Sequence, residues 1–115
     1  MPRSVLTTLL LFSILASSSA DAAAQALHAD VSYGPDPEQG LDIHASPAED
    51  RRGTFVFLHG GGYYLDDKSG VMRYVELLVA AGYDVVNMNY RLKRGIPPAT
   101  EDLVLALDFL LANAA

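Results

Sequence analysis

Hydrophobic and polar positions change their spacing several times along the chain, and each change marks an element. Residues 29–33 and 41–45 alternate apolar and polar side chains, as half-exposed strands do, and the Gly-Pro-Asp-Pro segment at 34–37 predicts the turn between them. Thr54–Leu58 is instead a continuous apolar run, rich in β-branched and aromatic residues and followed by glycines. That composition predicts a strand buried on both faces.

A helix and a further strand are predicted next. Apolar residues at helical spacing predict a helix over 71–81, with Asp67 or Ser69 as its N-terminal cap and Gly82 as its stop. The segment 83–90, with two valines at its centre, predicts a strand.

The last predicted helix follows Pro97-Pro98. We expect Thr100 to cap it and Glu101 and Asp102 to lie in its first turn, where the helix dipole favours negative charge. One face of this helix consists of leucines, at positions Leu103, Leu107, Leu110 and Leu111. Other apolar residues spread around the cylinder, so the helix is expected to be covered on more than one side.

The order of these elements predicts an α/β fold. Two opening antiparallel strands precede a strand-helix-strand-helix series, which is the pattern of a mainly parallel sheet. A third parallel strand is expected after the last helix, but the sequence stops at Ala115. We therefore expect the N-terminal part of a larger domain.

The first residues have the layout of a secretory signal peptide. A positive start is followed by an apolar run over 5–16 and by small residues with cleavage patterns after Ala24 or Ala26. The apolar run is shorter than the ~20 residues that a spanning helix needs, which argues against a stable membrane anchor. The expected division is a signal peptide over 1–24 and a domain over 25–115, exported to the periplasm or secreted.

Composition narrows the possible partners. The chain has no cysteine, so it forms no disulfide, and its formal net charge is -6 with a pI near 4.7. An acidic chain is repelled by phosphate backbones, so nucleic acid is not expected as a partner.

The most informative segment is the His-Gly-Gly-Gly run at 59–62. Consecutive glycines let the backbone approach a ligand closely, and amides displayed there can hold a developing oxyanion. A glycine-rich turn without a ligand is the alternative at this point. Neither phosphate-loop spacing, G-x-G-x-x-G or G-x-x-x-x-G-K-[ST], can be read here.

Several motifs in order resemble the α/β-hydrolase esterases and lipases. The strand followed by the 59–62 run resembles their HGGG oxyanion motif. Tyr33-Gly34 with Leu41-Asp42-Ile43 resembles their paired opening strands, Asp67-Lys68 resembles a G-D-K motif, and Asn89-Tyr90-Arg91-Leu92 resembles Y-R-L. The resemblance points to carboxylesterase, feruloyl-esterase-like and arylformamidase-like members. It implies an oxyanion hole at Gly61 and Gly62, with no cofactor and a small-molecule ester as substrate.

The chain departs from this family at two short segments and in lacking a nucleophile motif. Asp66 replaces the usual glycine before Asp67-Lys68, and Lys93-Arg94-Gly95 stands where many lipase-like members have Ala-Pro-Glu. In addition, no serine has glycines at both flanking positions of a G-x-S-x-G elbow. The nucleophile, the acid and the base histidine are therefore expected beyond Ala115.

Candidate residues near the glycines have supporting roles in this interpretation. In the family the catalytic histidine follows the serine, so His59 and Gly60 are expected to support the loop. Tyr63 and Tyr64 are candidates for the substrate cleft, with simple packing over the loop as the alternative.

The remaining polar residues are assigned structural roles. His28 and His44 are expected at the surface, and His44 with Asp42 is too small a set to predict a metal site. Asp66 and Asp67 are expected as a solvated loop residue and a helix cap. Asp102 is expected to be a structural partner of Arg91.

The leading hypothesis is the N-terminal fragment of an exported, serine-dependent carboxylic ester hydrolase, inactive by itself. A complete small exported binding protein, or a remnant of an enzyme, is the alternative. In the resembled fold the missing strand would pair with the outer edge of Thr54–Leu58. The fragment is therefore expected to self-associate through that open edge. The substrate, the choice among ester, amide and formamide hydrolysis, and the oligomeric state stay open.

Overall fold

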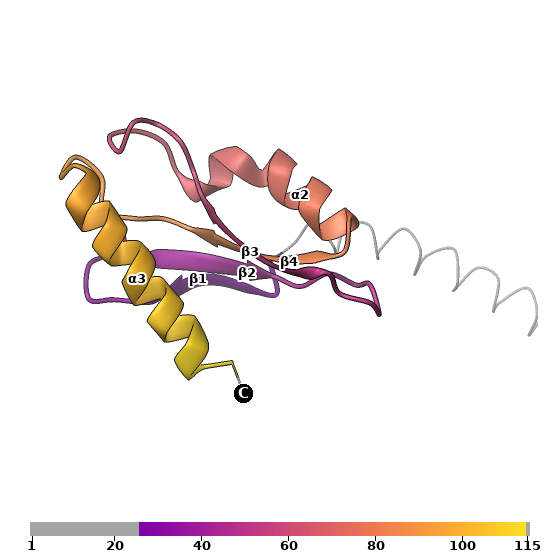
Figure 1. Cartoon of the computed structure of the whole chain (residues 1–115). Coiled ribbons are helices and arrows are strands. Elements are labelled where there is room, and N and C mark those ends of the chain that lie inside the picture. Colours follow the sequence, from indigo (N-terminus) through magenta and orange to yellow (C-terminus); the bar gives the residue numbers. More distant parts are fainter. Residues whose placement is uncertain (1–25, 115) are drawn as a thin grey trace, which may run out of the picture.

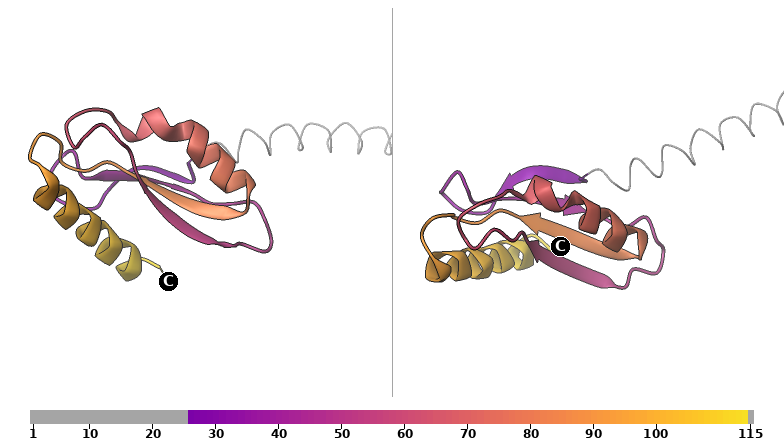
Figure 2. Two further views of the ribbon diagram at one scale, coloured as in Figure 1. Left: turned by 45° about the horizontal axis from the view of Figure 1, so that its top comes forward. Right: turned by 90° about the horizontal axis from the view of Figure 1, so that it is seen from above.

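The computed structural model describes residues 26–114, and the predicted signal peptide lies outside them. Within 26–114 no helix is both long enough and apolar enough to cross a membrane. The described part contains a mixed sheet with a helix on each face, which confirms the α/β prediction (Figures 1 and 2).

The sheet has four strands in the order β1-β2-β4-β3. These are β1 (His28–Ser32), β2 (Gly40–His44), β3 (Gly53–Leu58) and β4 (Tyr83–Met88). β1 pairs antiparallel with β2, and β2 pairs antiparallel with β4. β3 and β4 run parallel, so the predicted change from antiparallel opening strands to a parallel pair is confirmed.

Helices α2 (Met72–Ala80) and α3 (Ile96–Ala112) lie on opposite faces of this sheet (Figure 1). A short 3-10 turn, η1 (Lys68–Val71), precedes α2, and the Asp67 side chain caps it by accepting a hydrogen bond from the Ser69 N–H. Gly82 ends the helical segment with a φ of 99°, and its N–H donates to the Val79 carbonyl. Asp67 therefore caps η1 and not α2, whose N-cap Val71 makes no side-chain cap bond, so the predicted cap of the helix was wrong and the predicted stop is confirmed.

Alternation along β4 divides the core between the two helices. Val86 and Met88 pack in a cluster with residues of α3, whereas Val85 packs with α2. Val85 and Met88 are fully buried, as expected for a strand with a helix over each face and a partner along each edge.

The prediction that Thr54–Leu58 is buried on both faces was wrong. β3 lies at the edge of the described sheet, its first three residues are exposed, and its last three are half-buried. Phe55 keeps 42% of its surface accessible and meets Tyr83 edge-on, with ring centroids 4.8 Å apart. The apolar run identified a strand correctly, but its burial depends on neighbouring segments, which the local sequence does not specify.

The predicted start of the last helix was also wrong. α3 begins at Ile96 after Gly95, whose φ is 82°, and the two prolines lie in its first turn, where missing N–H groups cost little. Thr100 is inside the helix and its hydroxyl donates to the Ile96 carbonyl at 3.0 Å, so it is not the cap. Glu101 and Asp102 consequently lie beyond the first turn.

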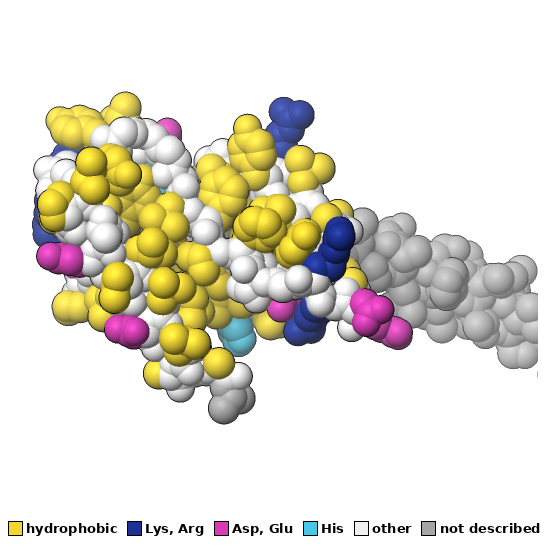
Figure 3. Space-filling model, in the orientation of Figure 1, with side chains coloured by type: hydrophobic (Ala, Val, Ile, Leu, Met, Phe, Trp, Pro, Cys, Tyr) yellow, Lys and Arg dark blue, Asp and Glu magenta, His cyan; other side chains and the backbone are white. Residues whose placement is uncertain are grey.

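The packed face of α3 matches the predicted leucine face only in part, because Leu103 and Leu110 pack against the core. Ala99, Asp102 and Ala106 are buried, while Leu107 and Leu111 are 39% and 76% exposed. The surface view shows hydrophobic side chains gathered over this helix (Figure 3). The small residues are fully buried because they let the helix approach the sheet closely, and Leu103, Phe109 and Leu110 pack partly buried beside them.

Two histidines of the opening strands differ in burial. His28 is exposed, as predicted, but His44 is 1% exposed and the prediction of a surface position was wrong. His44 lies opposite Val85 in the β2–β4 register, so it shares the covered interior of the sheet.

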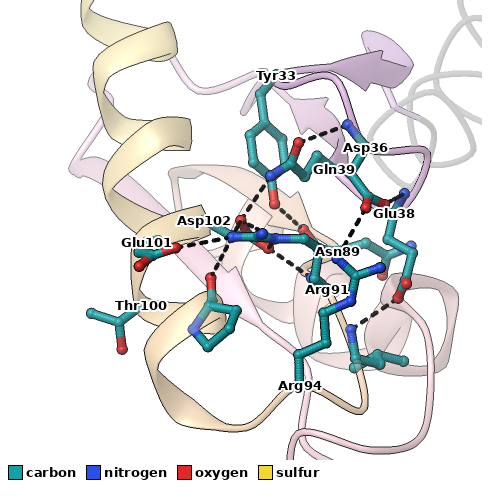
Figure 4. Close-up of polar contacts among 12 residues, drawn as sticks. Tyr33, Asp36, Glu38, Gln39, Asn89, Arg91, Arg94, Thr100, Glu101 and Asp102 are labelled. Atoms are coloured by element: carbon teal, nitrogen blue, oxygen red, sulfur yellow. Dashed lines mark hydrogen bonds and ion pairs between the residues drawn. The ribbon is translucent and has the colours of Figure 1, made fainter.

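The predicted pairing of Arg91 with Asp102 is confirmed (Figure 4). Asp102 is fully buried and accepts from the Arg91 Nε at 2.9 Å, the Arg91 backbone N–H at 2.7 Å and the Gln39 side chain at 2.8 Å. Burial alone would raise the pKa of Asp102, but these bonds outweigh it and hold the pKa below its usual range. The carboxylate therefore joins the start of α3 to the segment after β4 and to the turn before β2.

We expect the isolated chain to self-associate through β3, because an edge strand offers unpaired backbone groups. Phe55→Lys should shift the protein toward monomer in sedimentation velocity, since charge on an edge strand blocks pairing. Leu77→Lys is the matched control, because Leu77 is an equally apolar residue, 61% exposed, on α2. A monomeric wild type, or equal effects of both variants, would contradict a β3 interface.

Candidate functional site: the glycine loop after strand β3

The glycine loop, residues 59–67, joins the end of β3 to the cap of η1. Four of its residues have positive φ: Gly61 (121°), Gly62 (65°), Tyr63 (65°) and Asp66 (79°). Side chains with a Cβ rarely adopt such angles, so the two glycines occur where the backbone requires them. Tyr63 and Asp66 carry strain of a kind that concentrates at functional sites.

Gly61 is also the point of closest packing in the glycine loop. A Cβ added there would collide with the backbone carbonyl of Leu65, because the Gly61 carbonyl accepts from the N–H groups of both Tyr64 and Leu65. A Cβ at Gly60 or Gly62 would meet nothing within 4 Å. The three glycines are therefore not equivalent: Gly61 is needed for space and angle, Gly62 for angle alone, and Gly60 for neither.

His59 packs against the glycine loop and bonds to it. Only 3% of His59 is exposed, its Nδ1 lies 2.7 Å from the Gly60 carbonyl, and its ring stacks on Tyr90 with centroids 4.7 Å apart. Because a carbonyl can only accept, Nδ1 carries the proton in this bond. The Tyr90 hydroxyl donates to the His59 carbonyl at 2.6 Å, so a hydrogen bond and a ring stack both join these two residues.

A cavity of about 240 Å³ opens beside the glycine loop. Its lining is Leu58, His59, Gly60, Gly62, Tyr63 and Tyr90. The structure thus brings Tyr63 to the cavity but not Tyr64, which is 57% exposed and has the Lys93 ammonium 5.4 Å from its ring centre. Burial raises the pKa of Tyr90, so this hydroxyl stays protonated and remains a donor at neutral pH.

The far end of the glycine loop is fixed by charge. Lys68 is half-buried, and its ammonium pairs with Asp30 at 2.7 Å and with Asp42 at 3.0 Å. Burial would lower the pKa of Lys68, but the bonds to both carboxylates outweigh it and raise the pKa. The motif residue Lys68 therefore joins the glycine loop to β1 and β2.

Sequence reasoning missed two asparagines that contact this end. Asn87 on β4 donates to the Lys68 carbonyl at 2.7 Å, and Asn89 contacts both Asp67 and Lys68. Two polar residues spaced two apart in an apolar strand were a signal, since both project from the same face of the sheet. Within the part of the chain that the structure describes, no group of three acidic or histidine residues could hold a metal ion.

Comparison with known proteins follows this geometry. The BD-FAE family model matches residues 41–115, and the chain belongs to this family, an esterase domain of the α/β-hydrolase type. No curated protein matches the chain.

Solved structures share the fold at low identity. Esterase B from Lactobacillus rhamnosis is 22% identical with a TM-score of 0.60, covering 92% of this chain and 38% of that one. A bifunctional GH43-CE protein of Bacteroides eggerthii is 24% identical with a TM-score of 0.65, covering 76% and 12%. A bacterial heroin esterase is 21% identical with a TM-score of 0.52, covering 92% and 36%. The chain thus spans less than two fifths of each of these proteins.

Gly60 and Gly61 differ in what an added Cβ would meet, so their alanine variants form a matched pair. Gly61→Ala should lower the free energy of unfolding by about 1–3 kcal/mol, because the new Cβ collides with Leu65 at an unfavourable φ. Gly60→Ala should change it by less than about 0.5 kcal/mol. Urea unfolding followed by circular dichroism measures both, and equal effects would contradict the assigned backbone roles.

Asp67 predicts a dependence of stability on acid. Hydrogen bonds from the Ser69 backbone and from Asn89 lower its pKa from 3.8 to about 2. A lowered pKa in the folded state stabilises the fold above the ordinary value, and this contribution is lost as pH falls toward 2. Asp67→Asn should make the unfolding midpoint depend less steeply on pH over this acid range. The midpoints of the variant and of the wild type are measured in parallel. An unchanged slope would contradict the role of the carboxylate.

Proposed function

We propose that this chain supplies the HGGG half of the oxyanion hole of an exported, serine-dependent carboxylic ester hydrolase. The observation that carries the proposal is the glycine loop itself. Over residues 26–114, the amide N–H groups of Gly61 and Gly62 donate to no backbone carbonyl, although they lie in a tightly held turn beside a cavity. Amides held in this way are suited to receive a carbonyl oxygen.

The chemistry follows from what such donors can do. A serine oxygen attacks the ester carbonyl carbon while its proton passes to the base histidine, which later gives that proton to the departing alcohol, and the carbonyl π electrons move onto the carbonyl oxygen. The Gly61 and Gly62 amides then donate to that oxyanion, and each well-placed donor contributes about 10²–10³ in rate. Collapse of the tetrahedral intermediate releases the alcohol and leaves an acyl-serine, which water hydrolyses. No cofactor takes part in these steps.

The other catalytic groups are proposed to come from outside these 115 residues. His59 is unsuited to be the base, because its Nε2 is buried and because the base histidine of the resembled family follows the serine in the chain. Esterase B and the heroin esterase, which are similar in fold, support an ester as the substrate. Export is supported by the signal-peptide layout of residues 1–24.

A binding protein without catalysis is the second candidate. The observation that favours it is that the cavity and the Gly61 and Gly62 amides are formed by this chain without any triad residue. A cavity with two free amides would still accept a carbonyl or carboxylate oxygen of a ligand. The two candidates differ in whether a nucleophile follows residue 115.

The test is to read the coding DNA past Ala115 and to assay what it encodes. We expect the frame to continue into a G-x-S-x-G elbow, and the whole protein to hydrolyse a short-chain nitrophenyl ester. Replacing the elbow serine by alanine should abolish this activity, and the 115-residue chain should have none.

Either of two results would contradict the proposal. One is a continued frame without an elbow. The other is saturable hydrolysis by the 115-residue chain that a serine-directed inhibitor abolishes. A stop codon after Ala115 would favour the binding protein. The intact mass of the exported product determines both its first and its last residue. A product cleaved after neither Ala24 nor Ala26 would contradict the proposed signal peptide.

A further inference from the structure

Asn89 lies just after β4, at the point where the far end of the glycine loop meets the sheet. Its backbone is fixed on both sides: its N–H donates to the Gly40 carbonyl at 2.9 Å, and its carbonyl accepts from the Tyr33 hydroxyl at 2.6 Å. Burial raises the pKa of Tyr33 well above its usual value, so this hydroxyl stays protonated and keeps donating. The Asn89 side chain therefore projects from a rigid base (Figure 4).

The Asn89 carboxamide bonds two successive residues in opposite senses. Its Oδ1 accepts from the Lys68 backbone N–H at 2.7 Å, and its Nδ2 donates to the Asp67 carboxylate at 2.8 Å. Only a carboxamide presents an acceptor and a donor side by side in this way. Aspartate would keep the acceptor but place a second carboxylate against Asp67.

The same segment holds the glycine loop along its length. The Tyr90 hydroxyl bonds the His59 carbonyl, and the Lys93 N–H donates to the Tyr63 carbonyl at 2.9 Å. Asn89 fixes the remaining end, where the glycine loop enters η1. Gly61 and Gly62 lie between the first two of these points, and the Gly61 carbonyl accepts from Tyr64 and Leu65 on the way to the third.

We propose that Asn89 is a positioning residue for the oxyanion hole: its two-sided bond to Asp67 and Lys68 fixes the far end of the glycine loop and thereby the direction of the Gly61 and Gly62 amides. This inference rests on the proposed function, because it assigns a purpose to those amides. Bonds that hold donors before substrate arrives remove the cost of arranging them during the reaction.

Hydrogen exchange with mass spectrometry tests this on the whole chain without substrate, at concentrations below self-association. The N–H groups of Tyr64, Leu65 and Lys68 are bonded, so peptides spanning 59–70 report whether the glycine loop stays in place. Asn89→Ala and Asn89→Asp should each speed exchange in these peptides by about tenfold. Asn113→Ala is the matched control, since Asn113 is exposed at the end of α3 and far along the chain from the loop.

A reciprocal exchange separates positioning from general loss of stability. In the double variant Asn89→Asp with Asp67→Asn, the donor and the acceptor trade places, so protection of 59–70 should return. Val79→Ala, which removes buried volume under the far end of α2, should lower global stability without this selective acceleration. Failure of the double variant to restore protection, or the same acceleration in Val79→Ala, would overturn the inference.

The outcome is independent of esterase activity. Selective acceleration by Asn89 variants with full rescue supports positioning even if no ester is hydrolysed, in which case only the proposed function fails. An active enzyme whose Asn89 variants exchange like wild type would retain the function and lose this inference.

Discussion

β4 is the strand on which the rest of the described structure depends. It is hydrogen-bonded to β2 on one edge and to β3 on the other, and each of its faces is covered by a helix. Its last four residues are therefore buried, and its first two are half-buried. The segment that continues β4 holds the glycine loop, so the core of the sheet and the candidate site are one arrangement rather than two.

Charge is used sparingly and inside. Two networks neutralise buried or half-buried charge, one around Lys68 with Asp30 and Asp42, the other around Asp102 with Arg91. In each, a single residue contacts elements far apart in sequence, and a missing partner would leave a charge without water or counter-charge. Such groups add little net stability compared with apolar residues, but they are specific about which elements meet.

Much of the fold was predictable, because hydrophobic spacing depends on local geometry. The strands, α2 and the Gly82 stop were predicted from such patterns, and the Arg91–Asp102 pair was predicted as well. The errors have a common physical source in neighbours. β3 was expected to be buried because its apolar run is typical of a central strand, but no strand of residues 26–114 covers its outer edge. His44 is buried because β4 lies opposite, and the small residues of α3 face inward because the sheet is close.

The residues of the candidate site likewise fall into those that the sequence could predict and those that it could not. The glycines, His59 and Tyr63 could be identified from a motif, since their role follows from backbone freedom and adjacency to a strand. Asn89 could not, because its partners are 21 and 22 residues away and meet it only once the sheet has formed. A motif indicates which amides are proposed to bind an oxyanion, whereas the contacts proposed to position those amides are distributed over the fold.

The pairing of Lys68 with Asp30 and Asp42 also has a consequence for the order of folding. Those contacts close loops of 38 and 26 residues, and the asparagine contacts exist only after β4 has added to β2. Long closures cost entropy before they are rewarded. The glycine loop therefore gains its final shape late, after all the strands have paired, even though it precedes β4 in the chain. A ribosome that has released residues up to the glycine loop has not yet produced the surface that shapes it, so the site cannot form before the sheet that carries it.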